Sequence, residues 1–257
     1  MAQKRAEKSS RTERRLFLRE VPAEGQEFLL DGPRKRYICD VLRMRAGDPL
    51  ILFDGSGWQY RAVLLGVTRR QAQIRVQGRL KAQTESPIHI LLGIGLLKAQ
   101  KMDLVIQKTS ELGVTEVVPV QASRAVPLLT SERSQARRGR WQRIAQEACR
   151  QSGRTEIPEI KPVAAFEEIL AQAEEADLSL LFTPATSLDL DEAAKHVQTH
   201  PNRILLLVGP EGGFSPAEEE MAMRKGFLLV GLGPRTLRAE TAAILAVGLV
   251  QYQFGDL

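Results

Sequence analysis

Residues 204–237 read ILLLVGPEGGFSPAEEEMAMRKGFLLVGLGPRTL, and this stretch predicts the fold class of the chain. It begins with an apolar run, residues 204–208, that stops at the glycine-rich turn 209–213. A short and fully apolar run is typical of a buried strand in a parallel sheet. The carboxyl ends of such strands border the crevice in which open α/β sheets bind ligands. We therefore expect an α/β fold with a ligand site at this turn.

The second half of the same stretch repeats the pattern. Residues 215–218 have the composition of a helix N-terminus, with a serine cap, a proline in the first turn and a glutamate that reaches back to the cap. The helix is expected to end near Gly226, and residues 227–230 are expected to form the next strand. A second glycine-rich segment, 231–237, follows that strand. Two such turns on neighbouring strands would face one pocket.

The composition indicates a globular protein that folds as two domains. Of the 257 residues, 43% are hydrophobic and 26% are charged, which suffices for one or two buried cores. No apolar run approaches the roughly 20 residues of a membrane span, and the polar N-terminus has no hydrophobic signal core, so we expect a cytoplasmic protein without membrane contact. Cys39 and Cys149 are isolated, which argues against a disulfide framework or a zinc site. No bound metal is expected.

Charge is distributed unevenly along the chain. The net charge is +5, but the six basic and 14 acidic residues after position 161 give that part −8, so the first 161 residues carry +13. A basic front favours a polyanionic partner, most simply nucleic acid, and an ordinary solvated surface explains the same charge equally well. Residues 1–13 lack apolar periodicity and are expected to be a disordered basic tail.

Short segments separated by turn signals characterise residues 14–82. Strands are expected at residues 50–53, 59–65 and 73–76, with residues 54–57 closing a hairpin. This pattern predicts a small β-barrel. One helix, residues 34–43, is expected to interrupt it, because apolar residues recur there at helical spacing. Basic side chains surround this helix, and Arg36 and Arg43 are candidate RNA contacts, with a solvated helix face as the alternative.

Beyond Ser86-Pro87, apolar strands alternate with helices, which predicts a second domain, residues 83–257, built on a parallel sheet. The helix 133–152 has Arg140 and Arg150 on its polar face, and both are candidate RNA contacts. The remaining elements are expected as strands at 88–97, 116–121 and 178–182 and as helices at 98–112, 166–176 and 191–197. The last helix, from about Ala239, carries a face of small and apolar residues that is either packed in the fold or a dimer contact: Ala242, Leu245, Ala246, Leu249 and Val250.

Familiar nucleotide and hydrolase motifs are excluded. The 209–213 turn is followed by Phe214-Ser215 rather than Gly-Lys-Ser/Thr, so it is not a P-loop. Gly231-Leu232-Gly233 and Gly93-Ile94-Gly95 both lack the third glycine of a dinucleotide-binding fingerprint. The sequence has no Gly-x-Ser-x-Gly elbow. A pocket lined by the backbone of two stiff glycine-rich loops remains, and it suits a compact polar ligand.

Five stretches closely resemble the SPOUT methyltransferases, and specifically the RsmE family of 16S ribosomal RNA uracil-N3 methyltransferases. They are VLRMRAGDPLILFDGSG (41–57), KMDLVIQKTSELGV (101–114), EACRQSGRTEIPEI (147–160), LLLVGPEGGFSPAE (205–218) and LGPRTLRAETAAI (232–244). The resemblance implies a PUA-like RNA-binding β-barrel at residues 14–82 and a SPOUT-type α/β domain with a trefoil knot at 83–257. It also implies S-adenosylmethionine (S-adenosyl-L-methionine) as cofactor and a homodimer that acts on 16S rRNA within the assembled small ribosomal subunit.

The resemblance further implies the residues of the site. Loops of the knot would surround S-adenosylmethionine, and the residues assigned to its binding are Thr183, Leu207, Gly209, Pro210, Glu211, Gly212, Gly213, Leu232, Gly233 and Leu237. Gly212 is expected where backbone approaches the ligand, in a conformation that disfavours a side chain. Further candidate phosphate contacts, with a solvated face as the alternative for each, are Lys98, Lys101, Lys108 and Arg154.

Arg238 and Glu240 are the candidate catalytic residues. N3 of uracil is a weakly acidic imide, so its methylation needs one group that removes the proton and another that holds the charge spreading onto O2 and O4. The Arg238 guanidinium suits the second task, with a structural salt bridge to Glu211 as the alternative. Glu240 is the candidate base or the group that orients Arg238, or it simply favours the helix N-terminus through the dipole.

Two other functions remain open on the sequence alone. One is ribose 2′-O-methylation of rRNA or tRNA by a SPOUT enzyme, which attacks through a hydroxyl and needs no recognition of a base edge. The other is a ribosome-assembly factor that binds RNA without catalysis. The two glycine-rich loops argue against the second, because a binding module needs no cofactor cradle.

Overall fold

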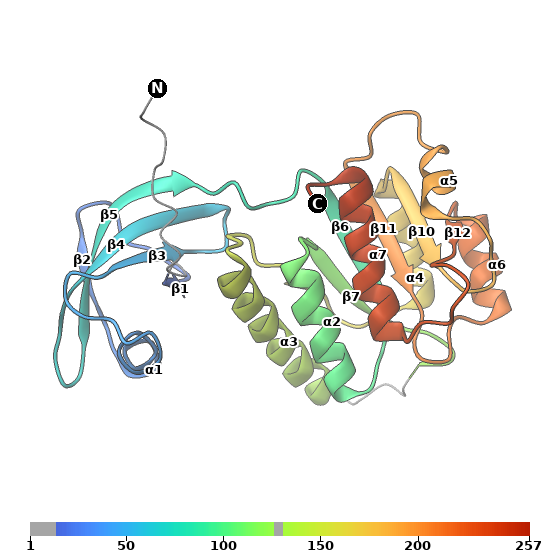
Figure 1. Cartoon of the computed structure of the whole chain (residues 1–257). Coiled ribbons are helices and arrows are strands. Elements are labelled where there is room, and N and C mark those ends of the chain that lie inside the picture. The colour runs from blue at the N-terminus through green and yellow to red at the C-terminus, as the bar shows by residue number, and fades with distance from the viewer. Residues whose placement is uncertain (1–13, 126–130) are drawn as a thin grey trace, which may run out of the picture. The chain divides into compact units, whose positions relative to one another are not determined.

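The structure is a computed structural model that describes residues 14–125 and 131–257 (Figure 1). The predicted basic tail, residues 1–13, lies outside the described residues. The chain divides between Ala82 and Gln83 into two compact units. None of the described helices is both long enough and apolar enough to cross a membrane.

The N-terminal unit is built on five strands, β1 (Arg15–Phe17), β2 (Glu27–Leu30), β3 (Pro49–Phe53), β4 (Trp58–Val67) and β5 (Ala72–Lys81). Their order is β1-β3-β4-β5-β2, with β1 parallel to β3 and the other neighbours antiparallel. Within the described residues the edge strands β1 and β2 do not pair, so the predicted barrel is an open sheet. Its core contains the fully buried side chains of Leu52, Leu64 and Ile74.

The predicted helix of this unit is shorter and less regular than expected. An α-helical turn, α1 (Gly32–Arg36), continues as a π-helical turn, η1 (Tyr37–Val41), in which the Leu42 N–H donates to the Tyr37 carbonyl oxygen at 3.0 Å. Arg43 has φ +50°, a left-handed conformation that no α-helix continues. Arg36 and Arg43 are both exposed, as their proposed role requires.

The C-terminal unit is built on a parallel sheet of seven strands, β6 (His89–Gly95), β7 (Glu116–Gln121), β8 (Glu159–Ile160), β9 (Ala164–Ala165), β10 (Leu178–Phe182), β11 (Arg203–Val208) and β12 (Leu228–Val230). The order is β12-β10-β11-β6-β7-β8, and β9 pairs with β7. The expectation that β11 and β12 are neighbours is wrong, because the chain inserts β10 between them and β10 pairs with both.

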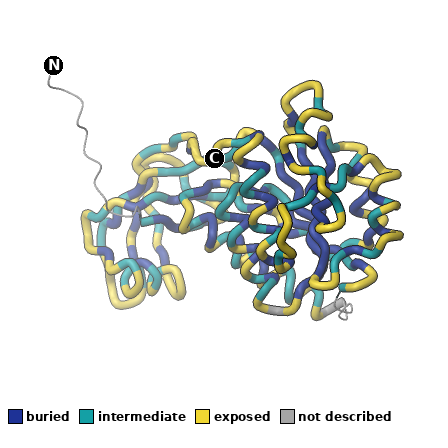
Figure 2. The backbone as a smooth tube through the Cα atoms, turned by 45° about the vertical axis from the view of Figure 1, so that its right-hand side comes forward, coloured by how far each residue is buried: buried dark blue, intermediate teal, exposed yellow. Residues whose placement is uncertain are grey.

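Helices cover both faces of this sheet (Figure 1). One face carries α2 (Ala99–Glu111), α3 (Ser131–Ser152), α5 (Leu190–Ala194) and α7 (Ala239–Phe254). The other carries α4 (Phe166–Ala171), the 3₁₀ turn η2 (Gln172–Glu175) and α6 (Pro216–Arg224). Alternate residues of β11 serve the two layers: Leu206 packs toward α7, whereas Leu205 and Leu207 pack toward α4. Figure 2 shows the buried sheet between the two helix layers.

Part of the predicted small-residue face of α7 is buried in its own unit, and part of the helix is exposed. Ala246 and Val250 are fully buried in the core of their own unit, so they are not available to a partner. Leu245 is 38% exposed and Tyr252 is 72% exposed. A dimer contact on α7 is therefore restricted to the side of the helix that carries these two residues.

Candidate active site

Three loops emerge at the carboxyl ends of β10, β11 and β12. Thr183-Pro184 follows β10, the turn 209–213 follows β11, and the segment 231–237 follows β12 and leads into α7. Because β10 lies between the other two strands and all three run parallel, the loops lie at one edge of the sheet. This edge is where an open α/β sheet binds its ligand.

A cavity of about 60 Å³ lies between the first and the third of these loops. Its walls are Phe182, Thr183, Pro184, Leu232, Gly233, Arg235, Thr236, Leu237 and Ala242. Four of the residues predicted to bind the cofactor, Thr183, Leu232, Gly233 and Leu237, therefore line one space. Ligand pockets typically enclose roughly 300–1,000 Å³, so a whole nucleoside cofactor needs more room than this cavity encloses.

The residues of the third loop that line this cavity have unpaired backbone groups in the described part of the chain. Among the described residues, no hydrogen-bond acceptor pairs with the N–H groups of Leu232, Gly233, Arg235, Thr236 and Leu237. Gly233 has φ +89°, a conformation that favours glycine. Unpaired backbone groups beside a cavity are suited to a heteroaromatic base that is recognised through its edge. The loop therefore suits the base of a nucleoside cofactor.

The turn after β11 is held by its own geometry. The Gly213 N–H donates to the Pro210 carbonyl oxygen at 2.9 Å, and Gly213 has φ +66°. A Cβ at Gly209 would lie 3.0 Å from Gly213 Cα, closer than the packing allows without a shift. The strained conformation expected at Gly212 is found at Gly213 instead. A side chain at Gly212 would first meet Arg124 Cβ, at 3.1 Å.

Two residues that support this turn were missed by sequence reasoning. Arg124 Nη1 donates to the carbonyl oxygens of Gly212 at 3.1 Å and Phe214 at 3.3 Å. On the other side, a Cβ at Gly95 would overlap the ring of Pro210, so β6 must end in a glycine. Gly95 carried a weak signal in its Gly-x-Gly string, whereas Arg124 belongs to no motif.

Leu207 and the turn 209–213 are not among the residues that line the 60 Å³ cavity. Leu207 is fully buried, and its side chain lies over Gly93, where a Cβ would overlap it. The side chain of Leu207 is therefore a core group.

Glu218 connects the start of α6 to the loop after β7. Its carboxylate accepts hydrogen bonds from Ser215 N–H at 2.7 Å and Ser123 N–H at 2.8 Å, and from both serine hydroxyls at 2.9 Å. Burial of the carboxylate opposes its ionisation, but these four bonds outweigh burial and hold the pKa of Glu218 below its usual value. The predicted capping box is confirmed, and it also fixes the segment that follows the 209–213 turn.

Lys101, a candidate phosphate contact, is ion-paired with two carboxylates. Its Nζ donates to Glu211 Oε1 at 3.1 Å and lies 3.5 Å from Glu240 Oε2. The bond to Glu211 raises the pKa of Lys101 against a smaller opposing effect of burial. Burial likewise opposes ionisation of Glu211, and the bond from Lys101 contributes to a pKa of Glu211 below its usual value. One ammonium therefore joins the turn after β11 to the start of α7.

Arg238 and Glu240 lie at the N-terminus of α7, and they differ in exposure. Arg238 is the N-cap residue and is exposed, and within residues 14–125 and 131–257 it forms no ion pair. The alternative salt bridge to Glu211 is absent there, since Glu211 pairs with Lys101. Glu240 is buried at 9% exposure. The structure thus presents one exposed cation and one buried carboxylate next to the loop 231–237.

The other candidate RNA contacts divide into exposed and internally bonded residues. Lys98 is exposed. Lys108 pairs with Glu111, Arg140 with Asp103 and Arg150 with Glu147.

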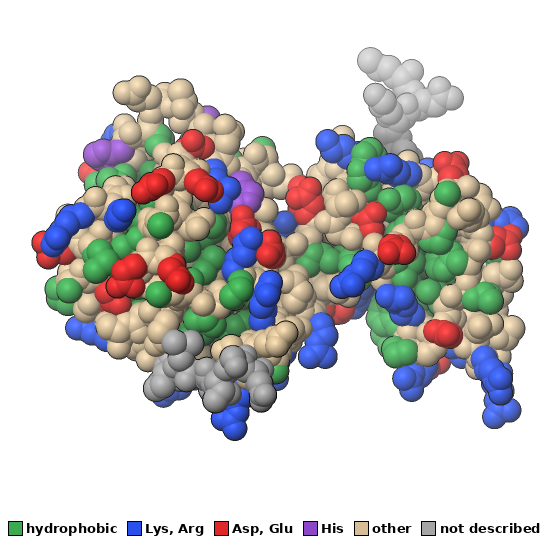
Figure 3. Space-filling view, turned by 180° about the vertical axis from the view of Figure 1, so that it is seen from behind, with side chains coloured by type: hydrophobic (Ala, Val, Ile, Leu, Met, Phe, Trp, Pro, Cys, Tyr) green, Lys and Arg blue, Asp and Glu red, His purple; other side chains and the backbone are tan. Residues whose placement is uncertain are grey.

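Figure 3 shows basic and acidic side chains interspersed on the face opposite α2, α3 and α7. The charge asymmetry along the sequence therefore does not produce a face of one sign there.

The prediction that Arg154 contacts RNA is wrong. Its side chain is 5% exposed and pairs with Glu85 at 2.8 Å. The guanidinium also donates to the carbonyl oxygens of Ser110 at 2.8 Å and Val114 at 2.9 Å. Arg154 turns inward because the carbonyls at the end of α2 need donors that the helix itself cannot supply. Arg150 is also largely covered, at 13% exposure, which weakens its case as a phosphate contact.

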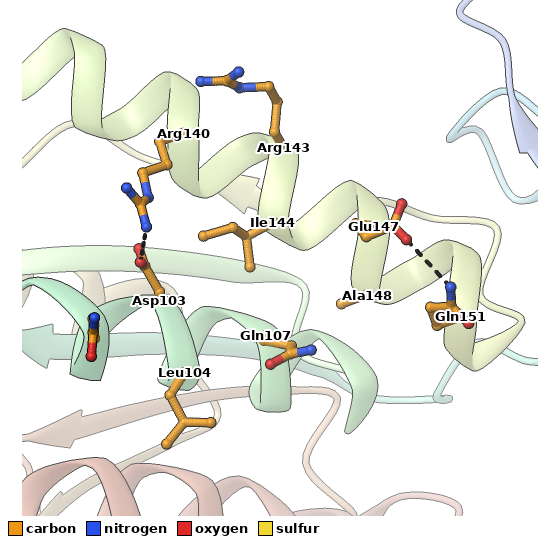
Figure 4. Close-up of a pocket in the computed structure, with 10 residues that line it drawn as sticks. Asp103, Leu104, Gln107, Arg140, Arg143, Ile144, Glu147, Ala148 and Gln151 are labelled. Atoms are coloured by element: carbon orange, nitrogen blue, oxygen red, sulfur yellow. Dashed lines mark hydrogen bonds and ion pairs between the residues drawn. The ribbon is translucent and has the colours of Figure 1, made fainter. Parts of the chain in front are cut away.

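A groove of about 760 Å³ between α2 and α3 lies away from the three loops (Figure 4). Arg140 points toward Asp103 across this groove, and Leu104, Ile144 and Ala148 contribute apolar groups. The groove shares no lining residue with the 60 Å³ cavity. Its size alone does not make it the reaction site, because the unpaired backbone groups and the buried carboxylate lie at the loops.

The sequence matches known families over most of its length. Residues 84–251 match the family described as RNA methyltransferase domain, and residues 30–77 match the family described as RNA methyltransferase PUA domain. The parallel sheet with its three loops and the separate N-terminal sheet therefore define an RNA methyltransferase with a PUA domain.

Individual relatives narrow this class. The chain is 32% identical to ribosomal RNA small subunit methyltransferase E of Bacillus subtilis, over 90% of this chain and 91% of that protein. Two solved structures each cover 95% of this chain and 99% of their own. They are a putative methyltransferase from Legionella pneumophila in complex with the cofactor SAM (33% identity, TM-score 0.87) and a ribosomal RNA small subunit methyltransferase E from Neisseria gonorrhoeae bound to S-adenosyl methionine (32%, 0.84). This chain belongs to the family of ribosomal RNA small subunit methyltransferase E, which confirms the resemblance found in its motifs.

Proposed function

We propose that this protein transfers a methyl group from S-adenosylmethionine to N3 of one uridine in 16S ribosomal RNA. The observation that carries the proposal is the loop 231–237, where residues whose backbone N–H groups are unpaired within the described residues line a cavity, and a buried carboxylate and an exposed arginine follow in the chain. The family of the chain supports it, since relatives of the same fold are described with the cofactor bound.

Two of the three loops would hold S-adenosylmethionine directly. Thr183 and the segment 232–237 would bind it from two sides through backbone groups, and the turn 209–213 would close a third side. When bound, the cofactor supplies a methyl group on a sulfonium sulfur. Arg124 and Glu218 would contribute by keeping the turn in place, because Arg124 bonds Gly212 within it and Glu218 bonds Ser215, two positions after it.

A SPOUT-type trefoil knot belongs to this proposal. Strand β12 lies at the edge of the sheet, yet α7, which follows it, packs on β11 and β6 nearer the middle. The segment 231–237 must therefore cross the end of β10, beside Thr183-Pro184. Such a crossing supports a chain that threads through its own loop.

The residues of α7 would perform the proton chemistry. Glu240 would accept the proton from uracil N3, and Arg238 would donate hydrogen bonds to O2 or O4, where the negative charge collects. The exposure of Arg238 supports this assignment, because a guanidinium engaged in a structural salt bridge could not reach the base. Burial of Glu240 supports its separation from bulk water.

The proposed partners are ribosomal RNA and a second copy of this chain. The natural substrate would be 16S rRNA in the small ribosomal subunit, bound in part by the exposed Arg36, Arg43 and Lys98. We also propose a homodimer in cytoplasm that uses the exposed side of α7, because Leu245 and Tyr252 leave apolar surface there. Light scattering at micromolar concentration tests the dimer, and a monomer would contradict it.

Mass mapping of ribosomal RNA from cells that lack this protein tests the proposed function. Loss of a single base-methylated uridine in 16S rRNA, restored by the gene in trans, is the expected result. Loss of a ribose methyl group instead would move the activity to 2′-O-methylation. An unchanged methylation pattern would leave a non-catalytic assembly factor.

A further inference from the structure

Lys101 of α2 lies between two carboxylates from different parts of the site. Its ammonium bonds Glu211 in the turn after β11 and lies 3.5 Å from Glu240 in the first turn of α7. The side chain of Lys101 is 33% exposed, and that of Glu240 is 11% exposed. A lysine outside the three loops therefore connects the second loop to the proposed base.

The nearer oxygen of Glu240 has unused capacity to accept hydrogen bonds. Glu240 Oε2 is buried, and within the described residues it makes no hydrogen bond. Buried polar atoms are normally bonded, because an unsatisfied one costs free energy. The Lys101 ammonium is the cation at ion-pair distance from this oxygen. A ligand that brings a donor to the site would supply the missing bond.

We infer that Lys101 is a positioning residue for methyl transfer, which holds the Glu240 carboxylate in place to accept the proton from N3 of the uracil ring. This inference rests on the proposed function. The N3–H bond breaks as the proton moves to Oε2. The electron pair left on N3 forms the bond to the methyl carbon, and the carbon–sulfur bond of the sulfonium breaks with its pair going to sulfur. Lys101 takes part in none of these bond changes.

The alternative for Lys101 is a direct contact with an RNA phosphate. The two carboxylates and one ammonium carry a net charge of −1 together, and this charge repels a phosphate. Lys98, the N-cap residue of α2, is exposed, and within the described residues it forms no ion pair. Lys98 is therefore the better candidate for a phosphate contact. A variant at Lys98 serves as the comparison for variants at Lys101.

A double-mutant cycle on the full-length protein with small-subunit substrate tests the inference: Lys101→Met, Glu240→Gln and the pair. Alone, Lys101→Met should lower kcat at saturating RNA by about 10-fold or more, part of what a general base contributes, with a change in the KM for RNA of less than about 2-fold. In the Glu240→Gln background it should add little further loss. Lys101→Arg should recover much of kcat, and Lys101→Gln replaces Lys101→Met if the latter does not fold.

Matched variants separate the two roles. Lys225→Met removes the lysine that follows α6 and is ion-paired with Glu174 of η2 at 3.7 Å, and it should leave kcat and KM unchanged. Lys98→Met should raise the KM for RNA and flatten its salt dependence. A raised KM for RNA with a flatter salt dependence in Lys101→Met would overturn the inference. So would a double mutant whose loss of kcat equals the product of the two single losses. Either result would leave the proposed function intact. A wild-type protein that transfers no methyl group to N3 would overturn the proposed function, and the inference with it.

Discussion

Arg238 and Glu240 are two positions apart, and their surroundings suit different tasks. Arg238 is exposed, so its guanidinium can reach a base that enters from solvent. Glu240 is buried beside Lys101, where its free oxygen is shielded from water. Methylation of a weakly acidic imide nitrogen requires a proton acceptor and a cation that stabilises the negative charge, and Glu240 and Arg238 suit these two roles.

Replacement of Arg238 by alanine should therefore affect chemistry more than cofactor binding. We expect Arg238→Ala to lower the single-turnover rate by ~100-fold or more, the usual loss for one electrostatic stabiliser, with little change in S-adenosylmethionine affinity. Arg224→Ala, which removes an exposed arginine paired with Glu220 on α6, is the matched control. Near-normal turnover of Arg238→Ala with saturating RNA would remove Arg238 from catalysis.

Arg154 should matter for stability and not for RNA. Arg154→Met removes the bonds that Arg154 donates to Glu85 Oε2 and to the carbonyls of Ser110 and Val114, and breaking a buried pair by removing one partner costs about 3–5 kcal/mol of unfolding free energy. Denaturant unfolding measures this loss, with the exposed Arg143→Met as control. A stable Arg154→Met variant with a reduced salt slope of RNA binding would contradict the structural role.

The elements around the site depend on close backbone packing at the end of β6. Gly95→Ala places a methyl group on Pro210, so the turn 209–213 must move away from the sheet. We expect calorimetry to show S-adenosylmethionine affinity reduced by about 10-fold or more, because a displacement of about 1 Å is costly at a preorganised site. Gly139→Ala in α3 is the matched control, since a Cβ there meets nothing within 4 Å. Equal affinities in the two variants would show that the turn does not bind the cofactor.

Ion pairs connect the amino-terminal ends of the strands, on the side of the sheet away from the three loops. Glu116 at the start of β7 pairs with His89 at 3.1 Å and Lys161 at 3.0 Å. The hydrogen bond with His89, followed by Lys161 and against burial, lowers the pKa of Glu116 from 4.5 to about 2. A lowered pKa stabilises the folded state above pH 4.5, and this contribution is lost as the pH falls from 4.5 to 2.

Glu116→Gln should therefore change the acid dependence of stability. We expect the variant to lose roughly 3 kcal/mol of unfolding free energy at neutral pH, from the size of the pKa shift, and to show a flatter acid limb between pH 4.5 and 2. Denaturant unfolding at a series of pH values measures both. Glu159→Gln, at a side chain that is 54% exposed, should retain the wild-type acid limb. An unchanged limb in Glu116→Gln would contradict the assignment.

At the scale of the whole molecule, local patterns predicted the elements well. The apolar run 204–208 and the capping box at Ser215 each specify a strand or helix boundary through nearby residues, and the structure places β11 and α6 accordingly. The family resemblance predicted Thr183, Leu232, Gly233 and Leu237 around one ligand space, and the structure brings these four residues together at one cavity.

Long-range placement could not be predicted from these patterns. The insertion of β10 between β11 and β12 depends on how the crossovers pack, which no local signal specifies. Lys101 and Arg154 looked like surface cations because their partners, Glu240 and Glu85, are 139 and 69 positions away. Arg124 was overlooked for the same reason, since the carbonyl oxygens that it bonds come from a distant turn.

Reconstituted methyl transfer tests the central claim most directly. Purified protein is incubated with S-adenosylmethionine carrying an isotopically labelled methyl group and with small ribosomal subunits from cells that lack this protein, and the digested rRNA is examined by mass spectrometry. We predict labelled N3-methyluridine at a single position of 16S rRNA, strongly reduced with Arg238→Ala. Label on a ribose 2′-oxygen, or no transfer to RNA, would contradict the account.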